Sequence, residues 1–424
     1  MNTYILVFLT LCTAIDDSSF DKYFSDGTLR VDYYYAGNDA KTEIFFDEMI
    51  KEPHWGGPKI LPENKDDMGN IRYNLYDSKS GKLLFSKGIS SLFQEWQTTA
   101  ESKTVSRAMS ATATMPFPLS KVLFEIEERE YKTGTFKKIF SLEIDPVDYF
   151  IRPELRVPCE WTKIVDNGDA ENHVDIAFIA EGYTKDEAEK FCKDVSAISG
   201  YILSQSPFDE YRDKFNIYAI SGISEESGTD IPGKKIYRNT VLNSSFYSFD
   251  LDRYLTVSDS KNVYNLAANV PYDAIFVLVN SDRYGGGGFY NWYAIATADN
   301  SAASAVAIHE FGHSFAGLAD EYYTSEVAYS DFYSFDVEPW EANITTLVDF
   351  DSKWKNMLDA TVSVPTPREA EYKDVLGVFE GGGYVAKGIY SPKQNCRMNS
   401  LNEMFCPVCQ RAIVKKIKYY CQCD

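Results

Sequence analysis

Basic residues are scarce in this sequence relative to acidic ones. Its 424 residues contain 42 lysines and arginines against 63 aspartates and glutamates, which gives a formal net charge of −21. Such an acidic surface repels phosphate backbones, and no run of basic residues compensates for it. The composition therefore argues against nucleic acid as a partner.

Long hydrophobic runs are also missing. The apolar run at residues 4–11 has eight residues, whereas a membrane-spanning helix needs about 20, so we expect no transmembrane segment. Small residues and then Asp16 and Asp17 follow this run, a pattern typical of a secretory signal peptide, here 1–14. We therefore expect a secreted or cell-surface protein. A lipid anchor at Cys12 and an N-terminal core strand are the alternatives.

Histidine is the scarcest chemically active residue, with only four copies. His54 lies beside a Trp-Gly-Gly-Pro loop and His173 precedes an apolar strand, so we interpret both as structural. His309 and His313 lie four residues apart, and this spacing is the strongest functional signal in the sequence.

Cysteine is concentrated near the end of the chain. The last thirty residues contain five of the eight cysteines, at positions 396, 406, 409, 421 and 423. In an exported protein such clustering favours disulfides over metal. The Cys406-Pro-Val-Cys409 segment could form half of a zinc knuckle, but no second pair at suitable spacing supports it. We therefore expect disulfides or a purely structural role.

Periodicity divides the chain into two parts. Apolar residues alternate with period two at 29–35, 71–76, 82–87, 122–128 and 136–144, which predicts an all-β sandwich domain over 20–150. Pro146, Pro153 and Pro158 then indicate a linker. Strands predicted at 174–180, 215–220, 272–281 and 291–297 alternate with helices at 185–205, 251–269 and 302–318. This pattern predicts an α/β (α+β) domain with a mixed sheet over 158–424.

The helix predicted at 302–318 contains His309-Glu310-Phe311-Gly312-His313. Histidines at i and i+4 share one face of a helix, so both imidazoles can bind one ion, and the glutamate between them can reach a water molecule at that ion. The residue types and spacing predict one catalytic Zn²⁺ with Glu310 as general base. Two ordinary structural histidines are the alternative.

A catalytic zinc needs a third protein ligand and one open position. Gly317 can end the helix in a left-handed turn, after which Asp320 and Glu321 follow. We predict Asp320 as the third ligand, with Glu321 as the rival. Metzincins place the corresponding glycine and third ligand one residue earlier, where this chain has Ala316 and Ala319.

A run of four glycines at 285–288 precedes this helix. It lacks the Lys-Ser/Thr pair of a phosphate-binding loop, so we predict a flexible turn that leads into strand 291–297. That strand would form the cleft edge on which an extended substrate pairs. Tyr290, Trp292 and Tyr293 could then line substrate pockets, although packing is the commoner role of aromatic strand residues.

The stretch 309–322 resembles the signature of the bacterial IgA-peptidase family of zinc metallopeptidases. Further segments agree with that family, at 175–183, 206–211, 227–232, 279–286, 395–398 and 405–409. The resemblance covers about 160–415, and the N-terminal part is similar to the sandwich-like domain that usually precedes the peptidase.

The resemblance implies a zincin-type fold and a secreted zinc endopeptidase. His309, His313 and Asp320 would be the ligands, and Glu310 the base. Met398 would form a Met-turn beneath the metal, although from the sequence alone it is a core methionine. Tyr322, Tyr323, Tyr390 and Tyr293 are candidates for oxyanion or substrate contacts.

The expected substrate is a protein or peptide, with immunoglobulin A and other host glycoproteins, including mucin-like ones, as candidates. A glycan- or protein-binding adhesion protein with a degenerate metal site is the alternative. The intact general base argues against that alternative, because a binding protein has no need for it.

Overall fold

A computed structural model describes residues 19–153, 155–323 and 332–423. The predicted signal peptide and Cys12 lie outside the described residues. Among the helices within these ranges, none has the length and apolar character needed to cross a membrane.

The N-terminal part forms two four-stranded sheets. The first has the order β5-β1-β2-β8 and the second β4-β3-β6-β7. Their strands are β1 (Phe24–Asn38), β2 (Lys41–Glu52), β3 (Ile71–Asp77), β4 (Leu83–Ile89), β5 (Arg107–Pro118), β6 (Val122–Arg129), β7 (Phe136–Ile144) and β8 (Ile151–Arg152). Apolar residues of both sheets, including Leu29, Val31, Tyr73 and Phe124, share one core. The N-terminal β domain expected from the sequence is present, with β2, β5 and β8 as unpredicted strands.

Strand β1 is buried on both faces, which explains how this β domain is fixed in place. Leu29 and Val31 point into the β core, whereas Arg30 and Asp32 are buried on the opposite face. Arg30 donates hydrogen bonds to Asp32 and, across the boundary, to Asn265 Oδ1 (2.9 Å). Alternation along one strand therefore supplies both a domain core and an interface.

The second part is built on a six-stranded sheet with the order β15-β16-β14-β10-β11-β9. Its strands are β9 (Trp161–Val165), β10 (Val174–Glu181), β11 (Phe215–Ile220), β14 (Ala274–Val279), β15 (Gly286–Gly288) and β16 (Ala294–Thr297). The four inner strands run parallel, and both edge strands are antiparallel to their neighbours. This is the predicted mixed sheet.

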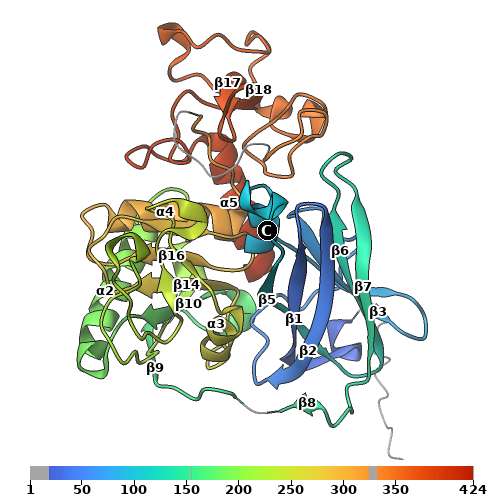
Figure 1. Cartoon of the computed structure of the whole chain (residues 1–424). Helices are drawn as coiled ribbons and strands as arrows, with labels where there is room; N and C mark the ends of the chain where they lie inside the picture. Colours follow the sequence, from blue (N-terminus) through green and yellow to red (C-terminus); the bar gives the residue numbers. More distant parts are fainter. Residues whose placement is uncertain (1–18, 154, 324–331, 424) are drawn as a thin grey trace, which may run out of the picture.

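Helices cover both faces of this sheet (Figure 1). Helices α2 (Ala188–Ile202), α4 (Ala303–Ala316) and α5 (Pro407–Cys421) share one core with the strands, and α3 (Ser260–Ala267) packs in the core on the other face. Side chains of β10 alternate between the two cores, with Phe178 in the first and Ile179 in the second. Burial on both faces is why β10 is apolar along its length.

Smaller elements complete the fold. They are α1 (Leu92–Gln97), the pair β12 (Ser244–Ser245) and β13 (Thr256–Val257), and the hairpin β17 (Phe379–Gly382) and β18 (Val385–Ser391). The hairpin belongs to a lobe between α4 and α5 that projects above the sheet in Figure 1. Short 3₁₀ helices lie at Phe20–Lys22, Glu101–Lys103, Ala170–Asn172, Lys185–Glu187, Phe208–Lys214, Pro232–Lys234, Ser248–Asp250, Phe350–Ser352, Lys355–Met357 and Ala370–Tyr372.

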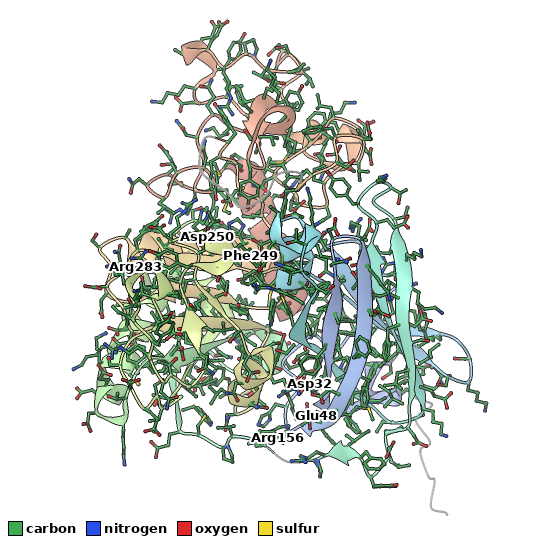
Figure 2. All side chains as sticks on the ribbon, viewed as in Figure 1. Asp32, Glu48, Arg156, Phe249, Asp250 and Arg283 are labelled. Atoms are coloured by element: carbon green, nitrogen blue, oxygen red, sulfur yellow. A yellow bond between two sulfur atoms is a disulfide. The ribbon has the colours of Figure 1, made fainter. Side chains whose placement is uncertain are left out.

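The connection between the two parts runs along the lower edge of the molecule. Arg156, in this connection, forms an ion pair with Glu48 of β2, and Figure 2 shows the two side chains at this edge near Asp32. Strand β8 also pairs with β2 in parallel. The predicted linker is therefore held against the β domain.

Two sequence predictions are wrong here. The helix predicted at 251–269 is only α3, because the Asp259 carboxylate accepts hydrogen bonds from the N–H groups of Lys261 and Asn262 and so caps the helix at Ser260. The glycine run predicted as a flexible turn is the edge strand β15. As a result β16 lies between β15 and β14 and is not an edge strand. The prediction that 291–297 forms the edge of the cleft is therefore wrong.

Candidate metal centre and active-site cleft

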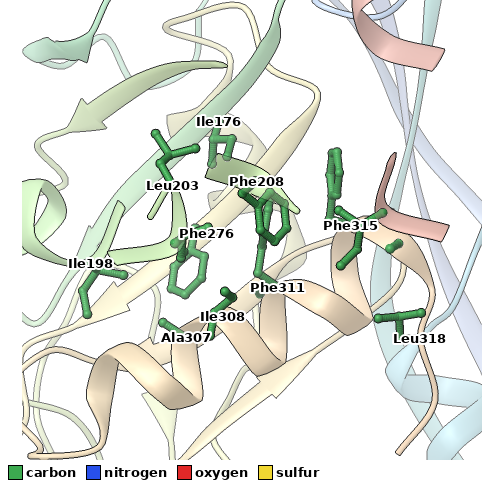
Figure 3. Packing of buried hydrophobic residues seen from close by; sticks show 14 of the residues in the cluster. Ile176, Ile198, Leu203, Phe208, Phe276, Ala307, Ile308, Phe311, Phe315 and Leu318 are labelled. Atoms are coloured by element: carbon green, nitrogen blue, oxygen red, sulfur yellow. The ribbon is translucent and has the colours of Figure 1, made fainter. Parts of the chain in front are cut away.

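Helix α4 is anchored by its apolar side. Ile308, Phe311 and Phe315 are buried against Phe208 and Phe276, with the Phe311 and Phe315 rings stacked at a centroid distance of 4.9 Å (Figure 3). Gly317 ends the helix with a φ of 62°, the left-handed turn predicted for it. This turn directs the following chain back beneath the helix.

His309 and His313 lie one turn apart on α4. Their Nε2 atoms are 3.2 Å apart. The Nδ1 atom of His309 lies 3.0 Å from the carbonyl oxygen of Arg397, and Nδ1 of His313 lies 2.5 Å from that of Leu318. A carbonyl oxygen can only accept, so each Nδ1 donates, and each Nε2 faces the other histidine.

Asp320 completes a triangle with the two histidines. Its Oδ1 atom lies 3.1 Å from Nε2 of His309 and 3.3 Å from Nε2 of His313. Ligands on bonds of about 2.0–2.1 Å to a tetrahedral zinc are separated by about 3.3 Å. The three atoms thus match one face of a zinc coordination tetrahedron.

The donor set also fits a cation electrostatically. Asp320 is 6% exposed, and its Oδ1 accepts no hydrogen bond from any described residue. Three lone-pair atoms at these distances repel one another unless a positive charge lies between them. Without a metal, a proton on His313 supplies this positive charge. Burial lowers the pKa of His313, but the effect of the Asp320 carboxylate is larger and raises this pKa to about 9. The residues fit the metal that the sequence predicted.

Glu310 lies between the two histidines and in the same group of potential metal ligands. Burial raises the pKa of its carboxyl group, and the neighbouring imidazoles partly oppose this shift. Two glycines of β15 make room for it, because a Cβ atom on Gly286 would lie 2.9 Å from Glu310 Oε1 and one on Gly288 would lie 2.4 Å from the Glu310 carbonyl oxygen. The glycine run therefore brings the sheet edge directly against α4.

The β17–β18 hairpin holds Asp320 from the opposite side. The Tyr384 hydroxyl donates a hydrogen bond of 2.9 Å to Asp320 Oδ2, and the Gly383 N–H donates one of 2.9 Å to the Asp320 carbonyl oxygen. The Tyr384 N–H also bonds the carbonyl of Tyr322 (3.0 Å). These contacts fix the carboxylate with Oδ1 facing the histidines.

Met398 lies beneath the same helix. It is fully buried, and its sulfur lies 3.1 Å from where a Cβ on Gly312 would be. The Met398 carbonyl oxygen accepts a hydrogen bond of 2.8 Å from the Glu321 N–H. The methionine sulfur thus packs against α4 at Gly312, and its role as a Met-turn stays a prediction.

A cleft of about 380 Å³ opens onto this centre, and both parts of the chain line it. From the β domain come Asn70, Ser91 and Glu95, and both Glu95 carboxylate oxygens accept hydrogen bonds from the Tyr254 hydroxyl (2.7 and 2.8 Å). The N-terminal domain therefore forms one wall of the cleft.

Arg253, Tyr284 and Tyr322 form a second wall. Burial lowers the pKa of Arg253, but Tyr322, Tyr284 and Asp320 together raise it above its usual value. A guanidinium and phenol groups next to the metal centre are suited to stabilising negative charge on a reacting oxygen.

Comparison with protein families decides the classification. The model of the family described as IgA Peptidase M64 matches residues 162–373 and 368–417. A second model, described as Peptidase M64 N-terminus, matches residues 19–141. The chain belongs to the IgA peptidase M64 family. No curated protein gives a significant match.

M64 membership makes the chain a peptidase and supports a metallopeptidase, in agreement with the potential metal-binding group at His309, Glu310 and His313. A protein or peptide substrate follows from the same assignment.

The predicted tyrosines fall in different places. Tyr322 and Tyr290 line the cleft of this M64 peptidase. Tyr293 is fully buried, and its hydroxyl accepts a hydrogen bond from the Val257 N–H (3.3 Å), so it is a core residue. Tyr390 on β18 and Tyr323, whose ring faces Arg368, are not among the residues that line the cleft within the described chain.

The remaining two histidines belong to neither group of potential metal ligands among the described residues, and their structural role stays a prediction. His54 is exposed, and its carbonyl accepts a bond from the Thr28 hydroxyl. His173 Nδ1 lies 2.8 Å from the Asp169 carbonyl.

Sequence reasoning did not find Arg253 or Tyr384. Arg253 lies in the stretch predicted as helix, and Tyr384 follows Asp320 by 64 positions. The Gly381-Gly382-Gly383 run was the only local signal near Tyr384, since it indicates a tight turn there.

Proposed function

We propose that this protein is a secreted zinc-dependent endopeptidase that hydrolyses peptide bonds in extracellular proteins. The observation that carries the proposal is the convergence of His309 Nε2, His313 Nε2 and Asp320 Oδ1 within 3.1–3.3 Å, next to Glu310. Asp320 is the third ligand in this proposal, and Glu321 is not, because its carboxylate lies among cysteines instead.

Bound zinc would supply Lewis acidity, which polarises a carbonyl group and makes water more acidic. Glu310 would accept the proton of the attacking water and return it to the leaving amine. Arg253 and Tyr322 would stabilise the negative charge that develops on the carbonyl oxygen. Tyr384 would hold Asp320, and Met398 would support the helix from below.

The family description motivates immunoglobulin A as the first substrate to test. Export remains an expectation from the sequence pattern at 1–14. Incubation of the purified protein with immunoglobulin A, immunoglobulin G and a mucin, followed by mass spectrometry of the fragments, tests both substrate class and internal cleavage.

Glu310→Gln tests the chemistry directly. We expect this variant to keep its zinc and to lose hydrolysis by at least about 100-fold, since general-base catalysis typically contributes 10²–10⁴-fold. Glu189→Gln, at an exposed position of α2, is the matched control and should retain wild-type activity. Undiminished proteolysis by a pure Glu310→Gln preparation would rule out the assignment.

A further inference from the structure

A second cluster of potential metal ligands lies beneath the catalytic centre. Cys396, Cys406, Cys409 and Glu321 present one ligand atom each, all within 4.8 Å of one another. None of the four is more than 3% exposed. Cys421 and Cys423 form a disulfide, but these three cysteines are not bridged. Of the two expected roles, disulfides or a purely structural one, disulfides therefore do not apply to these three cysteines.

The distances match a tetrahedral metal site. Cys409 Sγ lies 3.7 Å from Cys396 Sγ, 3.6 Å from Cys406 Sγ and 3.3 Å from Glu321 Oε1. Sulfur ligands on bonds of about 2.3 Å to tetrahedral zinc are about 3.75 Å apart, and a sulfur and a carboxylate oxygen about 3.5 Å. A disulfide would instead need a sulfur separation of about 2.05 Å.

The fourth potential ligand, Glu321, is only partly satisfied by hydrogen bonds from the described residues. Glu321 Oε2 accepts no hydrogen bond from any described residue, although it is fully buried. Cys406 occupies the N-cap position of the fifteen-residue helix α5, where the helix dipole favours a thiolate.

We propose that Cys396, Cys406, Cys409 and Glu321 bind a second zinc ion, at a structural site distinct from the catalytic centre. Three soft sulfur ligands and one oxygen favour zinc over calcium or magnesium, and four protein ligands leave no open position for substrate. With Glu321 ionised, the charge of the complex equals that of a four-cysteine zinc site. The Asn343 amide supports the site by donating a hydrogen bond of 2.9 Å to Glu321 Oε1.

This site would hold three parts of the catalytic centre together. Glu321 directly follows Asp320, and Cys396 precedes both Arg397, whose carbonyl accepts from His309, and Met398. Cys406 and Cys409 bring in the start of α5, which packs on α4. A single ion would thus fix the proposed third ligand, the partner of His309 and the methionine turn relative to one another.

The experiment uses the full-length chain with His309→Ala and His313→Ala, so that only the cysteine site can hold metal. We expect two zinc ions per wild-type chain and one per His309→Ala/His313→Ala chain by elemental analysis. Adding Cys409→Ser should reduce the count to zero, whereas Cys192→Ser, a half-buried cysteine on α2, should leave it at one. Loss of all zinc from the double histidine variant overturns the proposal.

Cobalt and alkylation provide readouts that do not depend on variant folding. Cobalt-loaded wild-type protein should show thiolate-to-cobalt charge transfer in the near ultraviolet, which the two histidines and Asp320 cannot produce. In denaturant with chelator and no reductant, Cys396, Cys406 and Cys409 should all alkylate. Protection of two of them until reductant is added would indicate a disulfide and refute the site. A wild-type chain with only the cysteine-bound ion would refute the catalytic zinc instead.

Discussion

The Tyr384→Phe variant tests how the proposed catalytic metal is held. The substitution removes one hydroxyl and with it the 2.9 Å hydrogen bond to Asp320 Oδ2. It keeps the aromatic ring, which lies edge-on to Tyr322 at a centroid distance of 5.5 Å. The perturbation therefore falls on the orientation of Asp320 and leaves all three ligand atoms in place.

The expected magnitude follows from two independent estimates. A hydrogen bond to a charged group contributes about 1.5–3 kcal/mol. Loss of a residue that orients a metal ligand typically weakens metal binding about 10–100-fold, which corresponds to about 1.4–2.8 kcal/mol. We therefore expect Tyr384→Phe to raise the zinc Kd about 10–100-fold, with kcat little changed at saturating zinc.

The assay is peptide hydrolysis measured against buffered free zinc, since it reports the catalytic site alone. Tyr237→Phe removes a hydroxyl from a side chain that is 64% exposed and is not among the residues that line the cleft, so it serves as the control. If Tyr384→Phe and Tyr237→Phe both give the wild-type zinc midpoint, Tyr384 does not orient a metal ligand.

Two further predictions concern stability. Gly288→Ala would place a Cβ 2.4 Å from the Glu310 carbonyl oxygen, so chemical denaturation should show a loss of about 1–3 kcal/mol together with reduced activity. Gly200→Ala on α2, where a Cβ meets no atom within 4 Å, should instead be neutral or stabilising by about 0.5–1 kcal/mol, and equal effects at both sites would contradict the close packing of β15 on α4. Burial raises the pKa of Glu52 to about 7, beside an Arg30 that Asp32 already neutralises. Because folded Glu52 keeps its proton above the unfolded value of 4.5, its contribution to stability is greatest at low pH and declines between about pH 4.5 and pH 7. Denaturation midpoints should therefore fall less steeply with pH in Glu52→Gln than in the wild type over this range, and identical slopes would show that Glu52 is not the titrating group.

Local periodicity was sufficient for much of the fold. The strand predicted at 136–144 coincides with β7, and the strand predicted at 215–220 coincides with β11. Both predictions were possible because the burial of a strand determines which of its positions are apolar. The helix that carries His309 and His313 could also be predicted from the sequence, since residues at i and i+4 are neighbours by helix geometry alone.

Contacts between distant segments could not be predicted from local patterns in the sequence. Tyr384 reaches Asp320 only because a hairpin folds back over the helix exit, and no local spacing encodes that contact. The cysteine cluster was missed for a related reason. A search for a second cysteine pair fails here, because the remaining ligand atoms come from Cys396 and from a glutamate 75 positions earlier.

The glycine run shows a different failure. Glycine propensity favours turns, and 285–288 was interpreted accordingly. In the structure the absence of side chains is needed at a strand, because α4 lies too close for a Cβ on Gly286 or Gly288. The packing of β15 against α4 therefore outweighed the preference of glycine for turns.

The N-terminal domain forms one wall of the cleft, and this has a consequence for how the substrate preference of the protein can change. Asn70, Ser91 and Glu95 face the cleft but belong to a domain that supplies none of the proposed metal ligands. Substitutions there would change the charge and width of the opening while leaving the ligand triangle intact. Changes at these residues of the β domain can therefore alter which polypeptides fit, independently of the proposed metal ligands.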